Sequence, residues 1–170
     1  MNIETILFYV FASVGIGSAL LMVTRRSPIM SALYLILNFF CLAGLYLILH
    51  AQFIAVIQII VYAGAIMVLF LFVIMLLNLG DERSLRDGLS WKKNVAVGLS
   101  GAVLLEIIYI ILSATDQLPL LQHPQSLQIG TIEFIGSQLF TTFLLPFEIT
   151  SLLLTAAIVG AIVLAKKKLD

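Results

Sequence analysis

Charged side chains are scarce in this sequence, and that scarcity decides the class of protein. Of its 170 residues, 11% are charged and 62% are hydrophobic, and the mean hydropathy is +1.17. A soluble domain is typically about one quarter charged, because it needs polar side chains to cover its surface. This chain has too few of them. A soluble globular fold is therefore excluded, and lipid is expected to solvate most of the surface.

Residues that hold metals or carry nucleophilic chemistry are also nearly absent. The single cysteine, Cys41, lies inside an apolar run and is expected to be a buried free thiol. His50 and His123 fall in connections and lack the pairing within the membrane that haem ligands need. The sequence contains no GxGxxG, P-loop, GxSxG or HExxH motif. We expect no catalytic, cofactor or metal site in this chain alone.

Five apolar runs are long enough to cross a bilayer, which takes roughly 20 residues. They cover residues 5–23, 29–49, 53–77, 95–113 and 142–165. The predicted fold is an all-α integral membrane protein, a bundle of five transmembrane helices in one domain spanning 1–170. Only residues 50–52 separate the second run from the third, so these two helices are expected to form a tight antiparallel hairpin.

Two longer connections remain. Residues 80–94 are polar and charged, and residues 114–141 contain Pro119 and Pro124. The second connection ends in a partly apolar stretch, 132–140, which predicts a short interfacial helix.

The positive charges predict an orientation. All nine Lys and Arg residues follow the first, third and fifth runs: Arg25 and Arg26, four residues between 83 and 93, and the tail 166–168. Cytoplasmic loops carry an excess of such residues. The N-terminus is therefore expected outside and the C-terminus in the cytoplasm. The first run has no preceding positive charge, which indicates a retained helix rather than a cleaved signal.

The third run carries the most informative residues. Gln58 and Tyr62 are four apart, so in a regular helix they share a face. Small residues give surfaces that another backbone can approach: Ala55, Ala63, Gly64 and Ala65. A glycine in such a cluster is also a place where a helix can kink or bulge. Ordinary close packing of helices is the alternative interpretation.

Small residues recur in the other runs, and they predict tight packing between the helices. Asn38 in the second run is a buried polar group that needs a partner. Small interlocking helices with little mass outside the membrane indicate one component of a larger assembly.

Two acids lie within the apolar runs, where a charge at the bilayer centre costs about 2.5–3.5 kcal/mol on insertion scales. Glu106 falls near the middle of the fourth run, and Glu148 near the outer end of the fifth, two residues after Pro146. Both are candidates for a proton path. The alternatives are a protonated Glu106 that is hydrogen-bonded to a neighbouring helix, and a Glu148 carboxylate that reaches headgroups or water.

Three blocks of sequence resemble the subunit J family of proton-pumping NADH:quinone oxidoreductase, respiratory complex I. The blocks are SPIMSALYL at 27–35, VYAGAIMVLFLFVIMLLN at 61–78, and GSQLF at 136–140 followed by LPFEITSLLL at 145–154. The second block is the most distinctive. The resemblance covers nearly the whole chain, whereas the connections and the fourth run match weakly.

The resemblance implies a membrane-arm subunit that binds no redox cofactor and lies beside subunits A, K, H and N in a bacterial cytoplasmic membrane. Flavin, iron–sulfur clusters and quinone are expected in partner subunits. Nucleic acid is not expected as a partner, because the formal net charge of zero gives no overall attraction to it. The resemblance also implies a π-bulge near Tyr62–Ala65, whose conversion to regular helix opens or closes a water path. Glu148 matches an acidic position of the family, whereas Glu106 matches none.

These expectations combine into one mechanism. Tyr62 would organise water, Gly64 with Ala63 and Ala65 would let the third helix switch, and apolar bulk from Met67 and Phe70 would close the path. Two other functions remain open: a subunit of a cation/proton antiporter, and a structural scaffold of the membrane arm. A stand-alone transporter is disfavoured, since the sequence has neither an inverted repeat nor a cluster of charges at the midplane.

Overall fold

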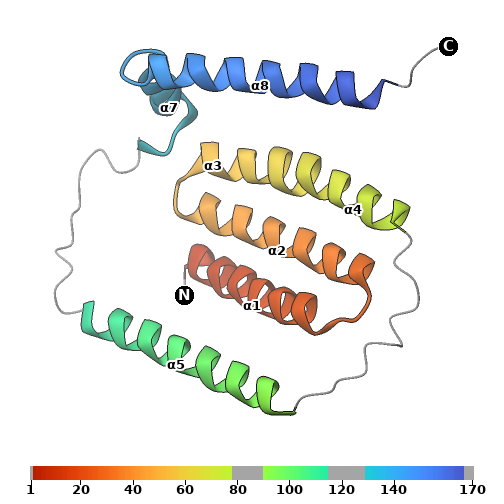
Figure 1. Cartoon of the computed structure of the whole chain (residues 1–170). Coiled ribbons are helices and arrows are strands. Elements are labelled where there is room, and N and C mark those ends of the chain that lie inside the picture. Colours follow the sequence, from red (N-terminus) through yellow and green to blue (C-terminus); the bar gives the residue numbers. More distant parts are fainter. Residues whose placement is uncertain (1, 78–89, 115–128, 167–170) are drawn as a thin grey trace.

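The computed structural model describes residues 2–77, 90–114 and 129–166, and every regular element in these ranges is a helix (Figure 1). The elements, in chain order, are α1 (Ile3–Thr24), α2 (Pro28–Ile48), α3 (Gln52–Ile57), η1 (Gln58–Ile66), α4 (Met67–Leu76), α5 (Ser90–Ala114), α7 (Ile132–Leu139) and α8 (Leu144–Ala165). The segments α3, η1 and α4 follow one another without a break and form the third span.

The five predicted spans are confirmed as helices that are long and apolar enough to cross a membrane. The short helix predicted at 132–140 is also present, as α7. The fourth helix begins at Ser90, five residues before the predicted 95, because its polar first residues continue a helix that hydropathy does not detect. Residues 80–89, Pro119, Pro124 and His123 lie outside the described residues. The orientation in the membrane stays a prediction.

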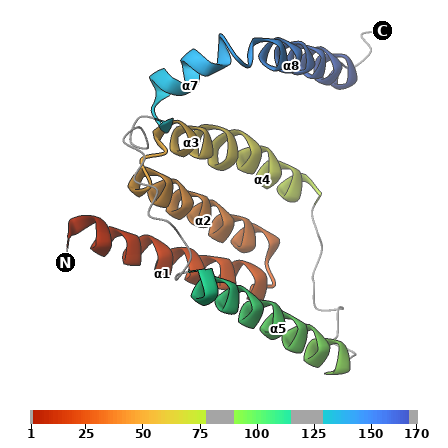
Figure 2. The same cartoon turned by 90° about the vertical axis from the view of Figure 1, so that its left-hand side faces the viewer.

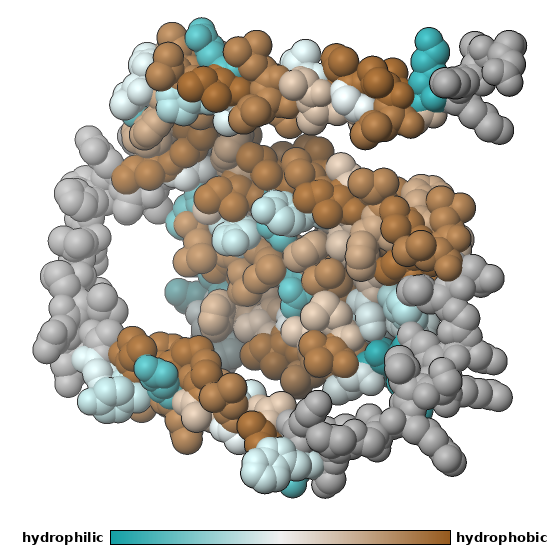
Figure 3. All heavy atoms as spheres, viewed as in Figure 1, coloured by the Kyte–Doolittle hydropathy of each residue, from teal (hydrophilic) through white to brown (hydrophobic). Residues whose placement is uncertain are grey.

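Three spans pack side by side: α1, α2 and the third span (Figures 1 and 2). Small side chains dominate the core of this layer, which consists of Ala32, Cys41, Ala43, Ala55, Ala63 and Met67. Large apolar side chains cover the outside instead (Figure 3). Small residues at an interface and large ones outside are what lipid-solvated helices require, because close backbone approach is a main source of their attraction.

The contact between α1 and α2 combines close approach with hydrogen bonds. A Cβ atom on Gly44 would lie 2.8 Å from the ring of Phe11, so the ring packs directly on the glycine backbone. The Asn38 amide donates to the carbonyl oxygen of Gly15 at 2.8 Å and to the hydroxyl of Ser18 at 3.3 Å. Asn38 therefore finds the partner that its place in an apolar helix demands.

The predicted tight hairpin between the second and third spans is confirmed. Beyond the last residue of α2, His50 adopts a positive φ of 58°. The His50 N–H donates to the Leu47 carbonyl at 3.1 Å, and the Ala51 N–H donates to the Tyr46 carbonyl at 2.9 Å. This is the pair of bonds that ends a helix in a Schellman motif, with histidine in the position that glycine usually takes.

Gly130 fixes the segment before α7 to this hairpin. A Cβ atom on Gly130 would collide with the carbonyl oxygen of His50, so only glycine allows the two backbones to approach so closely. The Phe53 N–H also donates to the Gly130 carbonyl at 3.4 Å. The Thr131 hydroxyl then accepts a hydrogen bond from the Phe134 N–H at 3.3 Å and caps α7.

The helices α5 and α8 stand apart from this layer, one beyond α1 and the other beyond the third span (Figures 1 and 2). No Cα atom of α5 lies within 8 Å of a Cα atom in another described helix, and α8 comes that close only to α7. The prediction of one five-helix bundle is therefore wrong for the described residues. Apolar side chains reveal that a helix enters lipid, but they do not reveal which helices it contacts.

Candidate functional site: the π-helical segment of the third span

The third span contains nine consecutive residues in π-helical geometry, η1 (Gln58–Ile66). At its end the Met67 N–H donates to the carbonyl oxygen of Tyr62, which lies five residues earlier. In an α-helix the acceptor would lie four residues earlier. The wide turn predicted near Tyr62–Ala65 is thus present. Such segments are rare, are usually limited to a single turn, and occur frequently at functional sites.

The π geometry changes which side chains face α2, the only non-adjacent described helix that η1 contacts. The buried residues of the third span are Ala55, Gln58, Ala63 and Met67. The spacing from Gln58 to Ala63 is five, where a regular helix has three or four. The wide turn therefore gives Ala63 the direction that Tyr62 would have if the whole span were α-helical.

Tyr62 is displaced from the buried face as a result. Its side chain is 46% exposed, whereas Gln58 is 8% exposed. The prediction that the two share a face assumed regular helix geometry and is wrong for this reason. The Tyr62 ring still meets α2 at its edge, where it lies T-shaped against Phe39 with centroids 5.7 Å apart.

Gly64 and Ala65 do not form a packing surface. A Cβ atom on Gly64 would meet only the carbonyl oxygen of Ile59 in its own helix, at 3.3 Å, and Ala65 is exposed. Of the small residues predicted to admit another backbone, Ala55 and Ala63 are buried and Gly64 and Ala65 are not. A side chain at position 64 would therefore press on the backbone of η1 itself and not on a neighbouring helix.

The two apolar candidates after η1 differ in their surroundings. Met67 is 2% exposed and belongs to the core of the layer. Phe70, at 46% exposed, lines an apolar cavity of about 280 Å³ among α1, α2 and α4. The cavity is lined by Met22, Pro28, Ser31, Ala32, Leu35, Phe70 and Ile74.

The two acids lie away from this segment. Glu106 is on α5, and Glu148 is in the first turns of α8. Both side chains are exposed, and neither contacts the third span, since α5 touches no other described helix and α8 touches only α7. The chain alone therefore does not bring the acids to Tyr62, and no described side chain is in place to pair with them.

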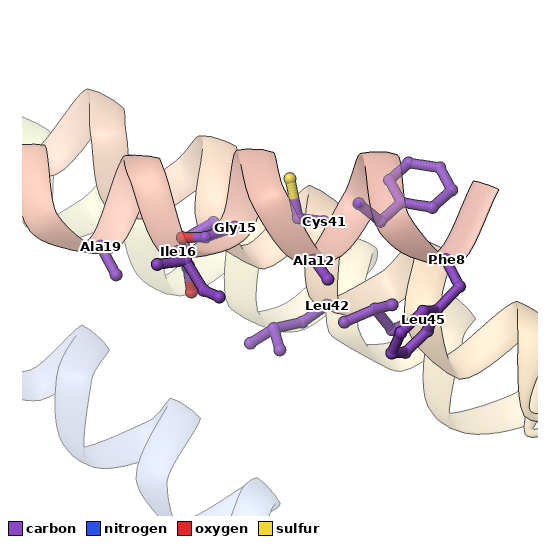
Figure 4. Close-up of a pocket in the computed structure, with 10 residues that line it drawn as sticks. Phe8, Ala12, Gly15, Ile16, Ala19, Cys41, Leu42 and Leu45 are labelled. Carbon is purple, nitrogen blue, oxygen red and sulfur yellow. Dashed lines mark hydrogen bonds between the residues drawn. The ribbon is translucent and has the colours of Figure 1, made fainter. Parts of the chain in front are cut away.

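A second apolar cavity, of about 330 Å³, opens between α1 and α2 (Figure 4). Its walls include Gly15 and Ile16 of α1 and Cys41 and Leu42 of α2 (Figure 4). Cys41 is buried and forms no disulfide, as predicted. Within the described ranges, no three His, Cys, Asp or Glu side chains gather as metal ligands would.

Two features of this region have no signal in the sequence. Phe39 is one of several aromatic residues in an apolar run, and nothing in the pattern marks it as the partner of Tyr62. Gly130 lies in a polar connection, where a glycine predicts only a turn. The contact of Gly130 with His50 joins residues 80 positions apart, so no local signal reveals it.

The chain matches the family of NADH-ubiquinone/plastoquinone oxidoreductase chain 6 over residues 18–164. It is 33% identical to NADH-quinone oxidoreductase subunit J of Rickettsia bellii and 35% identical to that of Escherichia coli. These alignments cover 97% and 91% of this chain and 82% of each relative. It is also 34% identical to NADH-ubiquinone oxidoreductase chain 6 of Marchantia polymorpha, over 96% of this chain and 87% of that protein. This chain belongs to the family of subunit J, or chain 6, a membrane subunit of NADH-quinone oxidoreductase.

Proposed function

We propose that this subunit helps couple quinone reduction to proton translocation by switching its third span between a π-helical and a regular α-helical form. The observation that carries the proposal is η1, a nine-residue π-helix in the middle of a membrane span. A bistable helix needs a difference of only a few kcal/mol between its two forms to respond to events in a neighbouring subunit. A π-helical turn contains about one residue more than an α-helical turn, so the span can adopt a π-helical and an α-helical form.

The burial pattern indicates what the switch would move. In the π form Ala63 and Met67 face α2. Conversion to α-helix beyond Gln58 would put Tyr62 in the direction of Ala63, and Ile66 in that of Met67. A tyrosine hydroxyl would then replace a methyl group at the interface. Tyr62 would organise water in one form and lie at the edge, against Phe39, in the other.

The region after η1 would rotate with it. Phe70 now lines the cavity of about 280 Å³, and Met67 fills the core. Rotation of α4 would exchange these bulky apolar side chains for their neighbours on the helix. Apolar constrictions close water paths by dewetting, so Met67 and Phe70 are suited to act as the closing elements.

The unsupported helices favour a subunit of a large assembly. Both α5 and α8 expose apolar side chains on all sides, and the exposed Glu106 falls within a span. Because a carboxylate facing hydrocarbon is costly, Glu106 should meet a polar group of another chain. The expected neighbours are subunits A, K, H and N and the lipid of a bacterial cytoplasmic membrane. Flavin, iron–sulfur clusters and quinone would be held by partners, and no redox cofactor by this chain.

Glu148 is the second acid of the proposed path. It lies in the first turns of α8, two residues after Pro146, where a carboxylate can reach the interface. Either acid would relay protons only after another subunit connects it to the third span, because the chain itself leaves α5 and α8 separate from η1.

A pure scaffold is the competing function, and the small residues buried between α1, α2 and the third span favour it. A scaffold needs no π segment, however, whereas a gate does. A subunit of a cation/proton antiporter, the other alternative, is disfavoured by the family to which the chain belongs.

The test compares Gly64→Leu with Gly17→Leu in the assembled complex, reconstituted in proteoliposomes. A Cβ atom at Gly64 presses on the wide turn of η1, whereas one at Gly17 meets no atom within 4 Å. We expect Gly64→Leu to lose proton pumping while the complex stays intact, and Gly17→Leu to pump normally. Wild-type pumping by Gly64→Leu would refute the gate, and loss of the complex in Gly64→Leu alone would favour the scaffold.

A further inference from the structure

One buried polar side chain in the described part of the chain has no protein partner. Two polar residues are buried there, Ser18 and Gln58. The Ser18 hydroxyl donates to the Gly15 carbonyl at 2.8 Å and accepts from Asn38 at 3.3 Å. The Gln58 amide forms no hydrogen bond with any described residue, although only 8% of the residue is exposed.

The position of Gln58 is defined by its neighbours. It is the first residue of η1, and its burial places it on the face against α2. Tyr62 lies beside Phe39, and α2 runs antiparallel to the third span. Four residues before Tyr62, Gln58 is therefore level with Ala43, which is 1% exposed.

The side-chain amide of Gln58 is buried but can still be reached by water. Among the described residues that are not exposed, every side-chain nitrogen or oxygen that water cannot reach has a hydrogen-bond partner. The Gln58 amide has no partner, so its atoms remain within reach of a molecule as small as water. An amide left without a hydrogen bond destabilises a protein, and within a membrane bulk solvent cannot satisfy it.

We propose that the side-chain amide of Gln58 binds an ordered water molecule between α2 and η1. A water molecule can donate to the amide oxygen and accept from the amide nitrogen, and it can bond to a nearby backbone carbonyl as well. A side chain of another subunit does not fit this site, because so little of Gln58 reaches the surface of the chain. The site therefore holds a small hydrogen-bonding ligand inside an otherwise apolar interface.

The experiment is a cryo-EM map of the assembled complex, at a resolution that shows ordered waters, for the wild type, Gln58→Leu and the matched control Gln52→Leu. Gln52 is exposed at the start of α3. We expect density for a water molecule about 2.7–3.2 Å from an amide atom of Gln58 in the wild type. The same density should persist in Gln52→Leu and disappear in Gln58→Leu.

A Gln58 amide bonded to a protein side chain, or without density at hydrogen-bond distance, would overturn the proposal. Density that persists in Gln58→Leu would also overturn it, because other groups would then hold the water. The wild-type map decides the question even if Gln58→Leu fails to assemble. It does so without reference to pumping, so the water site and the proposed gate are tested separately.

Discussion

Deletion of Ile60 would remove one residue from η1, between the buried Gln58 and Ala63. The spacing from Gln58 to Ala63 would fall from five to four, and the spacing from Ala63 to Met67 would stay four. A regular helix would then bury the same residues against α2. The span would shorten from 25 residues to 24, still above the roughly 20 that a bilayer needs.

The cost to assembly is small. Ile60 is 65% exposed, so about one third of its side chain packs against protein. Full burial of an isoleucine is worth about 1.5–3 kcal/mol, and the deletion therefore removes about 0.5–1 kcal/mol. Regular hydrogen bonding in the wide turn returns a similar amount, about 0.5–1.5 kcal/mol. The complex should form at nearly wild-type levels.

The effect on the switch is large. To re-form a π turn, the shortened span would have to bury side chains other than Ala63 and Met67 against α2. Overpacking a well-packed interface costs about 1–3 kcal/mol for each residue. Since about 1.4 kcal/mol is a factor of ten, pumping should fall to about a tenth of wild type or less.

The assay measures the amount of complex in native gels, NADH:quinone reduction, and acidification of the lumen of proteoliposomes. The control is Ile60→Ala, which removes the side chain but keeps the extra residue. The control should pump like the wild type. Wild-type pumping by the deletion variant, with intact complex, would show that the π turn is not needed and that the reasoning from burial is wrong.

Three further predictions concern packing and charge. Gly44→Ala should lower the stability of the α1–α2 contact by about 1–3 kcal/mol, seen as a lower melting temperature of the complex; adding Phe11→Ala should restore part of it, and additive losses would argue against the contact. Gly130→Ala should speed hydrogen exchange at the Phe53 amide about two- to tenfold, as expected from a lost hydrogen bond of about 0.5–1.5 kcal/mol; unchanged exchange would contradict it. Glu106→Gln should assemble but pump less than the wild type, since an amide cannot relay protons; wild-type pumping by the intact variant complex would remove Glu106 from the proposed proton path.

The sequence predicted the spans well because the signals that bound them are local. Arg25 and Arg26 follow α1 at once, Pro28 begins α2, and His50 lies in the turn that follows α2. Each signal acts within a few residues, so it can be read along the chain. The start of α5 was placed late at 95 for the opposite reason, since hydropathy detects the part of a helix that meets lipid and not its polar extension from Ser90.

The sequence predicts the position of the π segment correctly, but it does not predict which side chains the segment buries. The glycine at 64 and the resemblance to the family both pointed to a wide turn there, and η1 contains it. The face of the helix was nevertheless assigned with regular spacing, which pairs Gln58 with Tyr62. The structure buries Gln58 with Ala63 instead. One extra residue in a turn rotates every side chain that follows it about the helix axis. The bulge therefore changes which of the later residues face α2.

The mutual packing of the spans could not be predicted from apolar pattern at all. In water an apolar face must find another apolar face, and so amphipathic periodicity reveals contacts. In lipid a leucine packs as well against hydrocarbon as against protein, and only small residues and polar groups mark an interface.

Gly15, Ser18 and Asn38 mark an interface between α1 and α2, and this interface forms within the chain. Gly98 and Gly160 carry the same kind of signal on α5 and α8, yet an added Cβ atom at either would meet no atom of another described helix within 4 Å. Glu106 adds a polar group to α5 that no described residue satisfies. The small and polar residues of α5 and α8 therefore predict contacts with other subunits of the complex, whereas those of α1, α2 and η1 form contacts within this chain.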